Sequence, residues 1–343
     1  GNLLHPNEEN ARRIFLETPI LTNSEYNQLL NNSEKDFQAT VISLEYSDSL
    51  ENELDRIRQQ AGKAIHDGIS LIMLCDKVED ISTPTVPMLL AASSLHQYLI
   101  REGLRTKVSL IANSAEVREV HQFAALISFG VDAINPYLAY ATIQEAIEKR
   151  HLSMDYSIAM KKFRKGIAEG VVKVMSRMGI STVQSYRGAQ VLEAVGISQE
   201  VIAEHFTGTA SQIDGIDLET IGEEAKRRHE QALHSVKAEL ESGSDFQWRA
   251  DGEYHAFNPK TIHTLQWATR KNDYKLYLQY AEMANEEQLG FLRNLYDFKK
   301  TEQQIPLEEV ESVESIIKRF KTGAMSFGSI SKQAHETLAI AMN

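Results

Sequence analysis

Four short apolar runs, separated by amphipathic segments of helical length, constrain the fold of this chain more than any other feature. The runs lie at residues 40–46, 69–75, 107–112 and 131–134. Between them, apolar residues recur every three or four positions over 50–66, 84–101 and 115–129, a spacing that places them on one face of a helix. Continuous apolar strands that alternate with helices are typical of parallel βα units. The sequence therefore predicts an α/β fold with a parallel sheet of βα repeats, for which an incomplete TIM-like barrel is one possible form.

A fifth run, residues 181–185, is also compatible with a strand. If it is one, Tyr186, Arg187 and Gly188 follow at its carboxyl end, where parallel α/β proteins bind ligands. The segment FTGTAS at 206–211 adds hydroxyl groups and flexible backbone. These residues predict a contact surface or polar pocket, while the alternative remains open that their hydroxyls only cap helices and bond turns.

The composition of the sequence changes after residue 241. Residues 218–241 predict a solvated amphipathic helix, whereas 242–259 mix Gly, Ser, Asp, Asn and Pro with aromatic residues and predict an ordered loop. Helices are expected over 261–298 and 306–316. The last segment, from residue 320, reads as a strand, a glycine-rich turn and the start of a helix. We expect one domain over 1–241, a mostly helical linker over 242–319, and a further domain that starts at 320 and is cut off at 343.

Composition excludes several classes of protein. A formal net charge of −12 argues against a nucleic-acid partner, because such proteins concentrate Lys and Arg. No apolar stretch approaches the roughly 18 residues of a membrane helix, so no membrane partner is expected. The single cysteine, Cys75, allows neither an internal disulfide nor a site with several cysteine ligands, which favours a cytoplasmic setting. Phosphate-loop, zinc-protease, nucleophile-elbow and dinucleotide motifs are all missing.

Most isolated polar residues have a simpler interpretation than catalysis. His66, His96 and His121 lie in predicted helices without a neighbour at ligand spacing, so we expect no metal site. Cys75 lies within an apolar run and is expected in the core. Asp214 and Asp217 flank Gly215 and predict a turn.

The small residues of the tail could approach a flat ring or a phosphate closely. They are Gly323, Ser326, Gly328, Ser329 and Ser331. Exposed backbone amides at the end of a strand bind such groups, but an ordinary strand–helix turn explains the same residues.

Several long motifs in order resemble the large subunit of glutamate synthase. They are KVMSRMGISTVQSYRGAQ at 173–190, FTGTAS at 206–211, GEYHAFNP at 252–259 and GAMSFGSISKQAHETL at 323–338. Shorter matches at 16–21, 99–105 and 135–138 extend the resemblance over essentially the whole chain.

The resemblance implies a part of an oxidoreductase acting on CH–NH2 donors. In that family an amidotransferase domain releases ammonia from glutamine, and a TIM-barrel synthase domain combines it with 2-oxoglutarate and reduces the imine with FMN, fed through a 3Fe–4S cluster. This chain resembles the piece between those sites: the central domain at 1–241, a linker at 242–319 and the first part of the FMN-binding barrel at 320–343. The resemblance implies that Met325, Ser326 and Gly328 would lie beside FMN. The chain itself is expected to hold no cofactor and to be inactive.

The partners implied are the amidotransferase and synthase domains of the same polypeptide, and a small subunit or ferredoxin in the parent enzyme. The residues expected at an interdomain contact or ammonia path are Tyr186, Arg187, Thr207, Gly208 and Thr209. Two alternatives remain. One is a self-contained α/β enzyme that acts on a small anionic substrate near Arg187, and the other is an interaction module that uses the aromatic loop around Trp248 and Tyr254.

Overall fold

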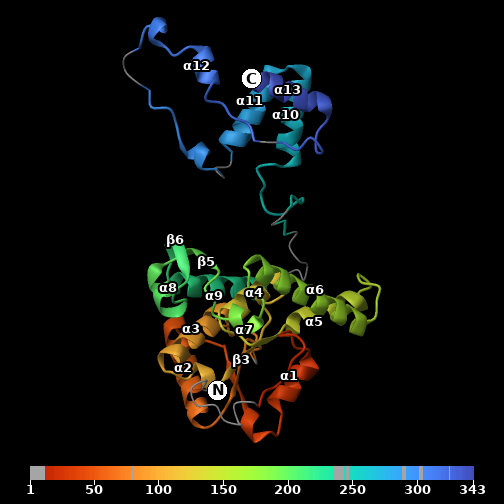
Figure 1. Cartoon of the computed structure of the whole chain (residues 1–343), viewed down its shortest axis with the longest axis vertical. Helices are drawn as coiled ribbons and strands as arrows, with labels where there is room; N and C mark the ends of the chain where they lie inside the picture. The colour runs from red at the N-terminus through yellow and green to blue at the C-terminus, as the bar shows by residue number, and fades with distance from the viewer. Residues whose placement is uncertain are drawn as a thin grey trace. The chain divides into compact units, whose positions relative to one another are not determined.

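The structure, a computed structural model, divides into two compact units, residues 1–237 and 238–343 (Figure 1). The residues that it describes are 12–78, 80–234, 243–244, 247–287, 291–300, 304–323 and 325–343.

The first unit is built on a parallel sheet of four strands. They are β1 (Ala39–Ser43), β2 (Leu71–Cys75), β3 (Ser109–Asn113) and β4 (Ala133–Asn135), and they lie side by side in that order. Beyond β4, the backbone amide of Leu21 donates to Ile134 O at 2.7 Å, so residues near 20 extend the sheet by a short bridge. The four apolar runs are thus confirmed as strands of a parallel sheet.

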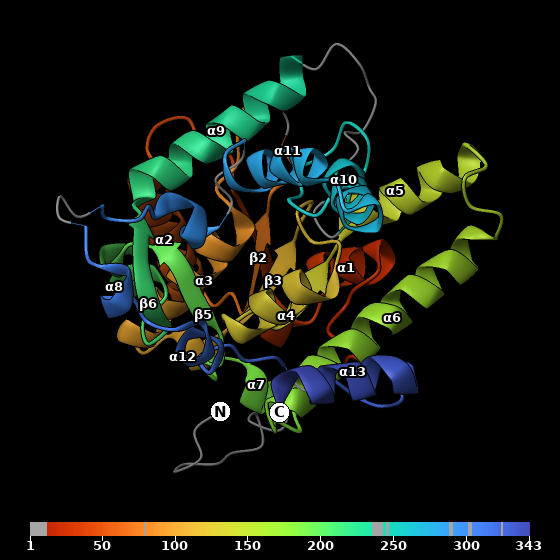
Figure 2. The same ribbon diagram turned by 90° about the horizontal axis from the view of Figure 1, so that it is seen from above.

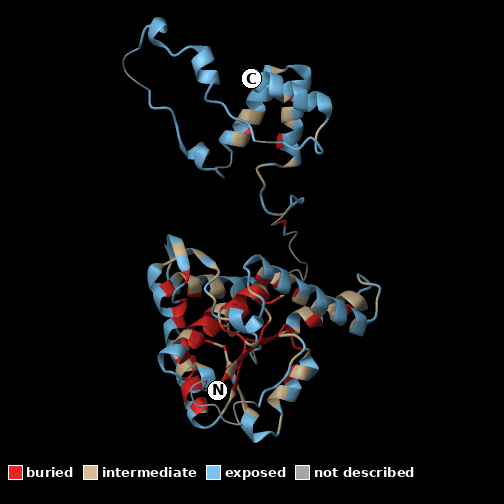
Figure 3. Ribbon diagram, in the orientation of Figure 1, coloured by how far each residue is buried: buried red, intermediate tan, exposed pale blue. Residues whose placement is uncertain are grey.

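Three helices connect these strands and cover one face of the sheet. They are α2 (Leu50–His66), α3 (Met88–Arg101) and α4 (Val120–Ser128). Because each crossover moves to the next strand in the same direction, the connecting helices stay on the same side. Residues such as Leu54, Leu95 and Phe123 pack there against Ile72 and the other strand residues of the main core. Figure 3 shows the buried residues gathered along these strands and helix faces.

A different set of residues covers the opposite face. Met73, Ile111 and Ala133 pack against Leu21 and Tyr26, and Tyr26 belongs to α1 (Asn23–Leu30). A capping box at Thr22 begins this helix. Sequential parallel strands with all connecting helices outside are the arrangement of half a βα barrel, and here α1 occupies the side that would be the barrel interior. The described part of the sheet stays open.

The rest of the first unit consists of further helices and a second pair of strands. Its elements are η2 (Lys35–Phe37), η3 (Arg105–Lys107), α5 (Tyr137–Glu148), α6 (Tyr156–Arg177), α7 (Val183–Tyr186), β5 (Glu193–Ile197), α8 (Gln199–His205), β6 (Ala210–Ile216) and α9 (Leu218–His234). Helices α5 and α6 lie side by side (Figure 2). Strands β5 and β6 form a separate parallel pair connected by α8. At their contact a Cβ on Gly215 would lie 2.0 Å from Gly196 O, so only glycine fits there.

In the first unit, one predicted strand is wrong, and two strands, β5 and β6, were not predicted. Thr182 Oγ1 accepts the Ser185 amide at 3.2 Å and caps α7, so the region 181–185 turns into a helix and not a strand. Strand β6 is mostly exposed and contains Gly215. Because it lacks a continuous apolar run, its sequence does not show the pattern that usually predicts a parallel strand.

The second unit is mostly helical. Its elements are α10 (Pro259–Lys271), α11 (Tyr274–Asn285), η4 (Leu292–Leu295), η5 (Leu307–Glu309), α12 (Val313–Ile317) and α13 (Lys332–Met342). The helical segment predicted over 261–298 contains two α-helices and the 3-10 turn η4: Asn272 adopts a left-handed conformation between α10 and α11, and α11 ends at Asn285. The helix predicted over 306–316 is a 3-10 turn followed by α12. The strand predicted near 320 is wrong for the described residues of that segment, which exclude Ala324.

None of the helices in the described part of the chain combines the length and hydropathy needed to cross a bilayer.

Candidate functional site

Tyr186, the last residue of α7, lies fully inside the first unit. Its ring is 0% exposed and belongs to the main core. Burial raises the pKa of the Tyr186 hydroxyl, and the nearby Ser128 opposes that shift. Because the hydroxyl has no partner with good hydrogen-bond geometry among the described residues, the ring contributes mainly by packing.

Arg187 forms an ion pair with Asp132, and Asp132 also pairs with Arg105. Arg187 Nη1 contacts Asp132 Oδ1, and Arg105 Nη2 donates to Asp132 Oδ2 at 3.0 Å. Asp132 Oδ2 further accepts the backbone amide of Leu110 at 2.8 Å. The carboxylate of Asp132 thus binds two arginines and a backbone amide of β3. All three charged side chains are at most 20% exposed.

His96 completes this cluster from α3. Its Nδ1 accepts from Arg105 Nε at 2.9 Å, and the residue is 7% exposed. Burial, aided by the positive charges of Arg105 and Arg187, lowers the pKa of His96 to about 4. The imidazole is therefore neutral at pH 7. Gly130, with φ of +109°, lies against the ring, since a Cβ there would come within 2.3 Å of Nδ1.

The cluster lies at the opposite end of the sheet from the one that the sequence predicted. Asp132 directly precedes β4 and Arg105 lies in η3 before β3, so Arg187 is at the amino-terminal end of the strands. The expectation of a carboxyl-end position is wrong because 181–185 is no strand, and α7 returns the chain to the start of the sheet. In βα barrels this end serves mainly stability.

The segment 206–211 packs beside the residues that follow Arg187. Gln190 Nε2 donates to Thr207 O at 3.3 Å, and Gly208, with φ of +81°, lies against the Gln190 side chain. Thr207 Oγ1 donates to Ala203 O at 2.8 Å, while Thr209 is buried. The structure thus places the sequence-predicted residues on one flank of the first unit, where Thr207 and Gly208 are exposed and Tyr186 and Thr209 are not.

A polar row at the carboxyl end of the sheet was missed by the sequence analysis. Ser43, Cys75, Asn113 and Asn135 are the last residues of the four strands and are partners in register. Asn113 Nδ2 donates to Cys75 Sγ at 3.2 Å, while Oδ1 of Asn113 and of Asn135 has no partner in the described structure. Cys75 is buried as predicted. The available signal was an asparagine directly after each of the runs 107–112 and 131–134.

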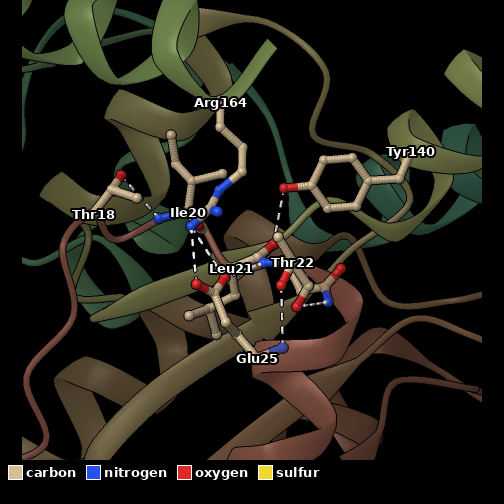
Figure 4. Close-up of polar contacts among 8 residues, drawn as sticks. Thr18, Ile20, Leu21, Thr22, Glu25, Tyr140 and Arg164 are labelled. Carbon is tan, nitrogen blue, oxygen red and sulfur yellow. Dashed lines mark hydrogen bonds and ion pairs between the residues drawn. The ribbon is translucent and has the colours of Figure 1, made fainter. Parts of the chain in front are cut away.

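Polar contacts fasten the segment before α1 to the later helices (Figure 4). Arg164 of α6 donates to Ile20 O at 3.0 and 2.8 Å and pairs with Glu25 at 3.0 Å. Tyr140 of α5 donates its hydroxyl hydrogen to Leu21 O at 2.9 Å. These bonds join segments far apart in the sequence, so sequence patterns could not predict them.

The turn predicted around Gly215 is wrong, because Asp214 and Gly215 lie in strand β6 and Gly215 does not have a positive φ. Asp214 Oδ1 accepts the amides of Gln199 at 3.1 Å and of Gly215 at 3.0 Å. Asp217 Oδ1 accepts the Thr220 amide at 2.8 Å where α9 begins. Among the residues described, no cluster of three or more His, Cys, Asp or Glu could hold a metal ion.

The tail residues form an isolated turn. Ser326 Oγ accepts the Gly328 amide at 3.2 Å, and Ser326 O accepts the Ser329 amide at 3.0 Å. Met325 is 47% exposed. A single exposed turn can form one wall of a binding site but encloses nothing.

The fold and these clusters define a parallel α/β domain of the half-barrel type, followed by a helical unit. A family model described as the glutamate synthase central domain matches residues 1–198, and one described as a conserved region in glutamate synthase matches 255–343. The chain therefore belongs to the glutamate synthase family.

Individual relatives agree over the full length of the chain. It is 59% identical to the glutamate synthase [NADPH] large chain of Bacillus subtilis, 37% to the glutamate synthase [NADH] of Schizosaccharomyces pombe and 35% to the ferredoxin-dependent glutamate synthase 2 of Synechocystis. Each match covers 100% of this chain but only 23%, 17% and 24% of the respective relative. The chain thus spans about a quarter or less of their length.

Proposed function

We propose that this chain is the central connecting part of a glutamate synthase large chain. The whole polypeptide would make glutamate from glutamine and 2-oxoglutarate by internal ammonia transfer and FMN-dependent reduction. The observation that carries the proposal is the 59% identity to a large chain over every residue of this sequence, with both family models matched in order.

The first unit suits a mechanical role, in which it separates and orients the amidotransferase and synthase domains of the same polypeptide. Its core is continuous across the sheet and the helices α2, α3, α4 and α6, so the unit moves as a packed body. The contacts of Arg164 and Tyr140 hold Ile20 and Leu21 against that body and so help to orient a domain that would precede it.

The tail residues Met325, Ser326 and Gly328 would contribute small side chains and backbone to the FMN site of the parent enzyme. When bound, FMN would supply the hydride that reduces the imine. Ser326 Oγ already accepts the Gly328 amide, and the turn is exposed, so this chain by itself is proposed to bind no FMN and to be inactive. The 3Fe–4S cluster would use cysteines elsewhere, because Cys75 is buried and single.

The electron donor and further partners belong to the same proposal. The relatives include NADPH, NADH and ferredoxin forms by name, so a small subunit and ferredoxin are alternative partners. We propose a cytoplasmic location, which agrees with the single reduced cysteine.

Flavin absorbance tests the connecting role. The purified chain is incubated with FMN and desalted, beside a polypeptide extended through the complete synthase domain. Only the extended polypeptide should retain flavin, because a barrel site is assembled from loops after several strands. Tight FMN binding by the short chain would instead support a self-contained enzyme.

A second experiment tests the exposed flank that Thr207 and Gly208 form. In the full enzyme, Thr207→Ala removes an exposed hydroxyl that donates to Ala203 O. If this flank contacts a neighbouring domain, glutamine-dependent synthesis should fall relative to ammonia-dependent synthesis. An unchanged ratio would remove Thr207 from the contact.

A further inference from the structure

The two arginines that share Asp132 are not equivalent. Arg105 is almost fully engaged, since its donors reach His96 Nδ1 at 2.9 Å, Val108 O at 2.7 Å, Gly130 O at 2.7 Å and Asp132 Oδ2 at 3.0 Å. Its side chain is 13% exposed. Arg105 therefore acts as a structural residue that joins the loops before β3 and β4.

Arg187 has fewer acceptors and more access to solvent. Nη1 pairs with Asp132 and Nη2 donates to Gln184 Oε1 at 2.8 Å. A guanidinium carries five N–H donors, so three find no acceptor within the described residues. The side chain is 20% exposed, and the following residue, Gly188, is exposed. One side of this guanidinium can therefore be reached by a solute.

The charges of the cluster do not balance. Asp132 is its single carboxylate among the described contacts, and both its oxygens are already used, Oδ1 by Arg187 and Oδ2 by Arg105 and the Leu110 amide. His96 is neutral and accepts at Nδ1, so its proton is on Nε2. This leaves an excess of one positive charge in a partly buried place, and burial, with the charge of Arg105, lowers the pKa of Arg187 to about 10.

The glycine after Arg187 leaves the space beside His96 Nε2 without a side chain. Gly188 has φ of +72°, and a Cβ at that position would lie 3.6 Å from His96 Nε2. Because glycine has no side chain, the Nε2–H group is not covered from that direction. Arg187 and His96 Nε2 thus present donors around one exposed glycine.

We propose that Arg187, with His96 Nε2–H beside it, binds an oxyanion of the carboxylate or phosphate type at the amino-terminal end of the sheet. The planar fork of a guanidinium matches two oxygens of such a group, which an ammonium cannot do. The oxyanion can be a free small anion or a carboxylate side chain from another part of a longer polypeptide. The site stands on the contacts of the first unit and does not depend on the function proposed above.

The test compares anions on the 343-residue chain at constant ionic strength. Replacing chloride by acetate, or by inorganic phosphate, should raise the Tm by about 3 °C at roughly ten times the dissociation constant. Arg187→Gln should abolish that difference between anions. Arg177→Gln loses the same charge from an exposed position of α6 and should respond like the wild type. Arg187→Lys should keep only part of the effect, because it keeps the charge and loses the fork.

The difference between anions is the readout, so a lower stability of the Arg187 variants does not obscure it. If the Arg187→Gln variant does not fold, the wild-type chain is titrated with acetate or phosphate and the Nε–Hε NMR resonance of Arg187 is followed. Its chemical shift should change with anion concentration along a saturating curve. An equal response of wild type and Arg187→Gln, or a resonance that does not move, would overturn the site.

A longer polypeptide then distinguishes the two sources of the oxyanion. Loss of the acetate and phosphate effect there, with the Arg187 resonance already at its bound position, would assign an internal carboxylate. Retention of the effect would assign a free anion.

Discussion

The two units of this chain differ sharply in how many of their apolar side chains are buried. In the first, one cluster of buried residues runs from the strands through α2, α3, α4 and α6 to α8. In the second, Ala268 and Met283 are the buried apolar residues among those described, whereas Phe298 is 92% exposed and Leu307 and Ile340 are 81% exposed. The first unit therefore buries most of its apolar residues against one another, whereas the second leaves most of its described large apolar residues exposed.

This difference in burial shows that a segment can match a family model without burying its own apolar residues. Both units match glutamate synthase models, yet large exposed apolar surfaces mark places that other protein covers. Local capping stabilises the helices of the second unit. At the start of α10, for example, Asn258 Oδ1 accepts the amides of Lys260 and Thr261 at 3.0 and 3.1 Å. This agrees with the proposal that its packing is completed by a larger domain.

The largest expected effect on stability is found by comparing a buried phenylalanine of the first unit, Phe123, with an exposed one of the second, Phe298. Phe123→Ala should destabilise the first unit by about 3–5 kcal/mol, because the ring is 0% exposed and leaves a cavity beside Phe163. Phe298→Ala should change stability by no more than about 0.5 kcal/mol. Urea unfolding of both variants measures this, and comparable losses would break the comparison.

The next effect separates a partly buried ion pair from an exposed one. Asp132→Asn should cost about 2–4 kcal/mol, because Arg105 and Arg187 lose their shared carboxylate in a place of low solvation. The matched variant Glu311→Gln, which removes the exposed pair with Arg319, should have little effect. Thermal unfolding distinguishes them, and an unaffected Asp132→Asn variant would show that the cluster is not structural.

Acid should weaken the first unit through His96. Its pKa is lowered to about 4 in the folded state, while the unfolded chain binds a proton near 6.5. The stabilisation is therefore complete above pH 6.5 and is lost as the pH falls toward 4, by on the order of 2–3 kcal/mol. Urea unfolding between pH 4 and 7.5 should show a flatter dependence for His96→Asn, whose amide oxygen can still accept from Arg105. Identical slopes would contradict the assignment of a neutral, buried His96.

The smallest effect concerns the segment before α1. Tyr140→Phe removes the hydroxyl that donates to Leu21 O and should cost about 1 kcal/mol, because a buried carbonyl loses its partner. In the second unit, Tyr277→Phe changes a residue that is 46% exposed and should be nearly neutral. Hydrogen exchange of the amides near Leu21 should accelerate in the first variant alone, and equal protection in both would show that this contact does not fasten the segment.

Sequence patterns were sufficient wherever a residue's environment depends on its near neighbours. The apolar period over 50–66 gave α2 with the bounds Leu50–His66, and continuous apolar runs gave the four strands of the main sheet. The patterns failed for β6, whose exposed residues lack that run, and for 181–185, where the Thr182 cap favoured a helix. They also placed Arg187 at the wrong end of the sheet.

The sequence by itself determined the family, the α/β class and the parallel sheet, because these follow from motif order and hydrophobic period. Only the tertiary structure decided which charges meet. Asp132, Arg105 and Arg187 come from three separate segments of the chain. Arg164 bonds to Ile20 O although the two residues are far apart in the sequence. Such contacts depend on how the helices pack on the sheet, and no local pattern records that packing.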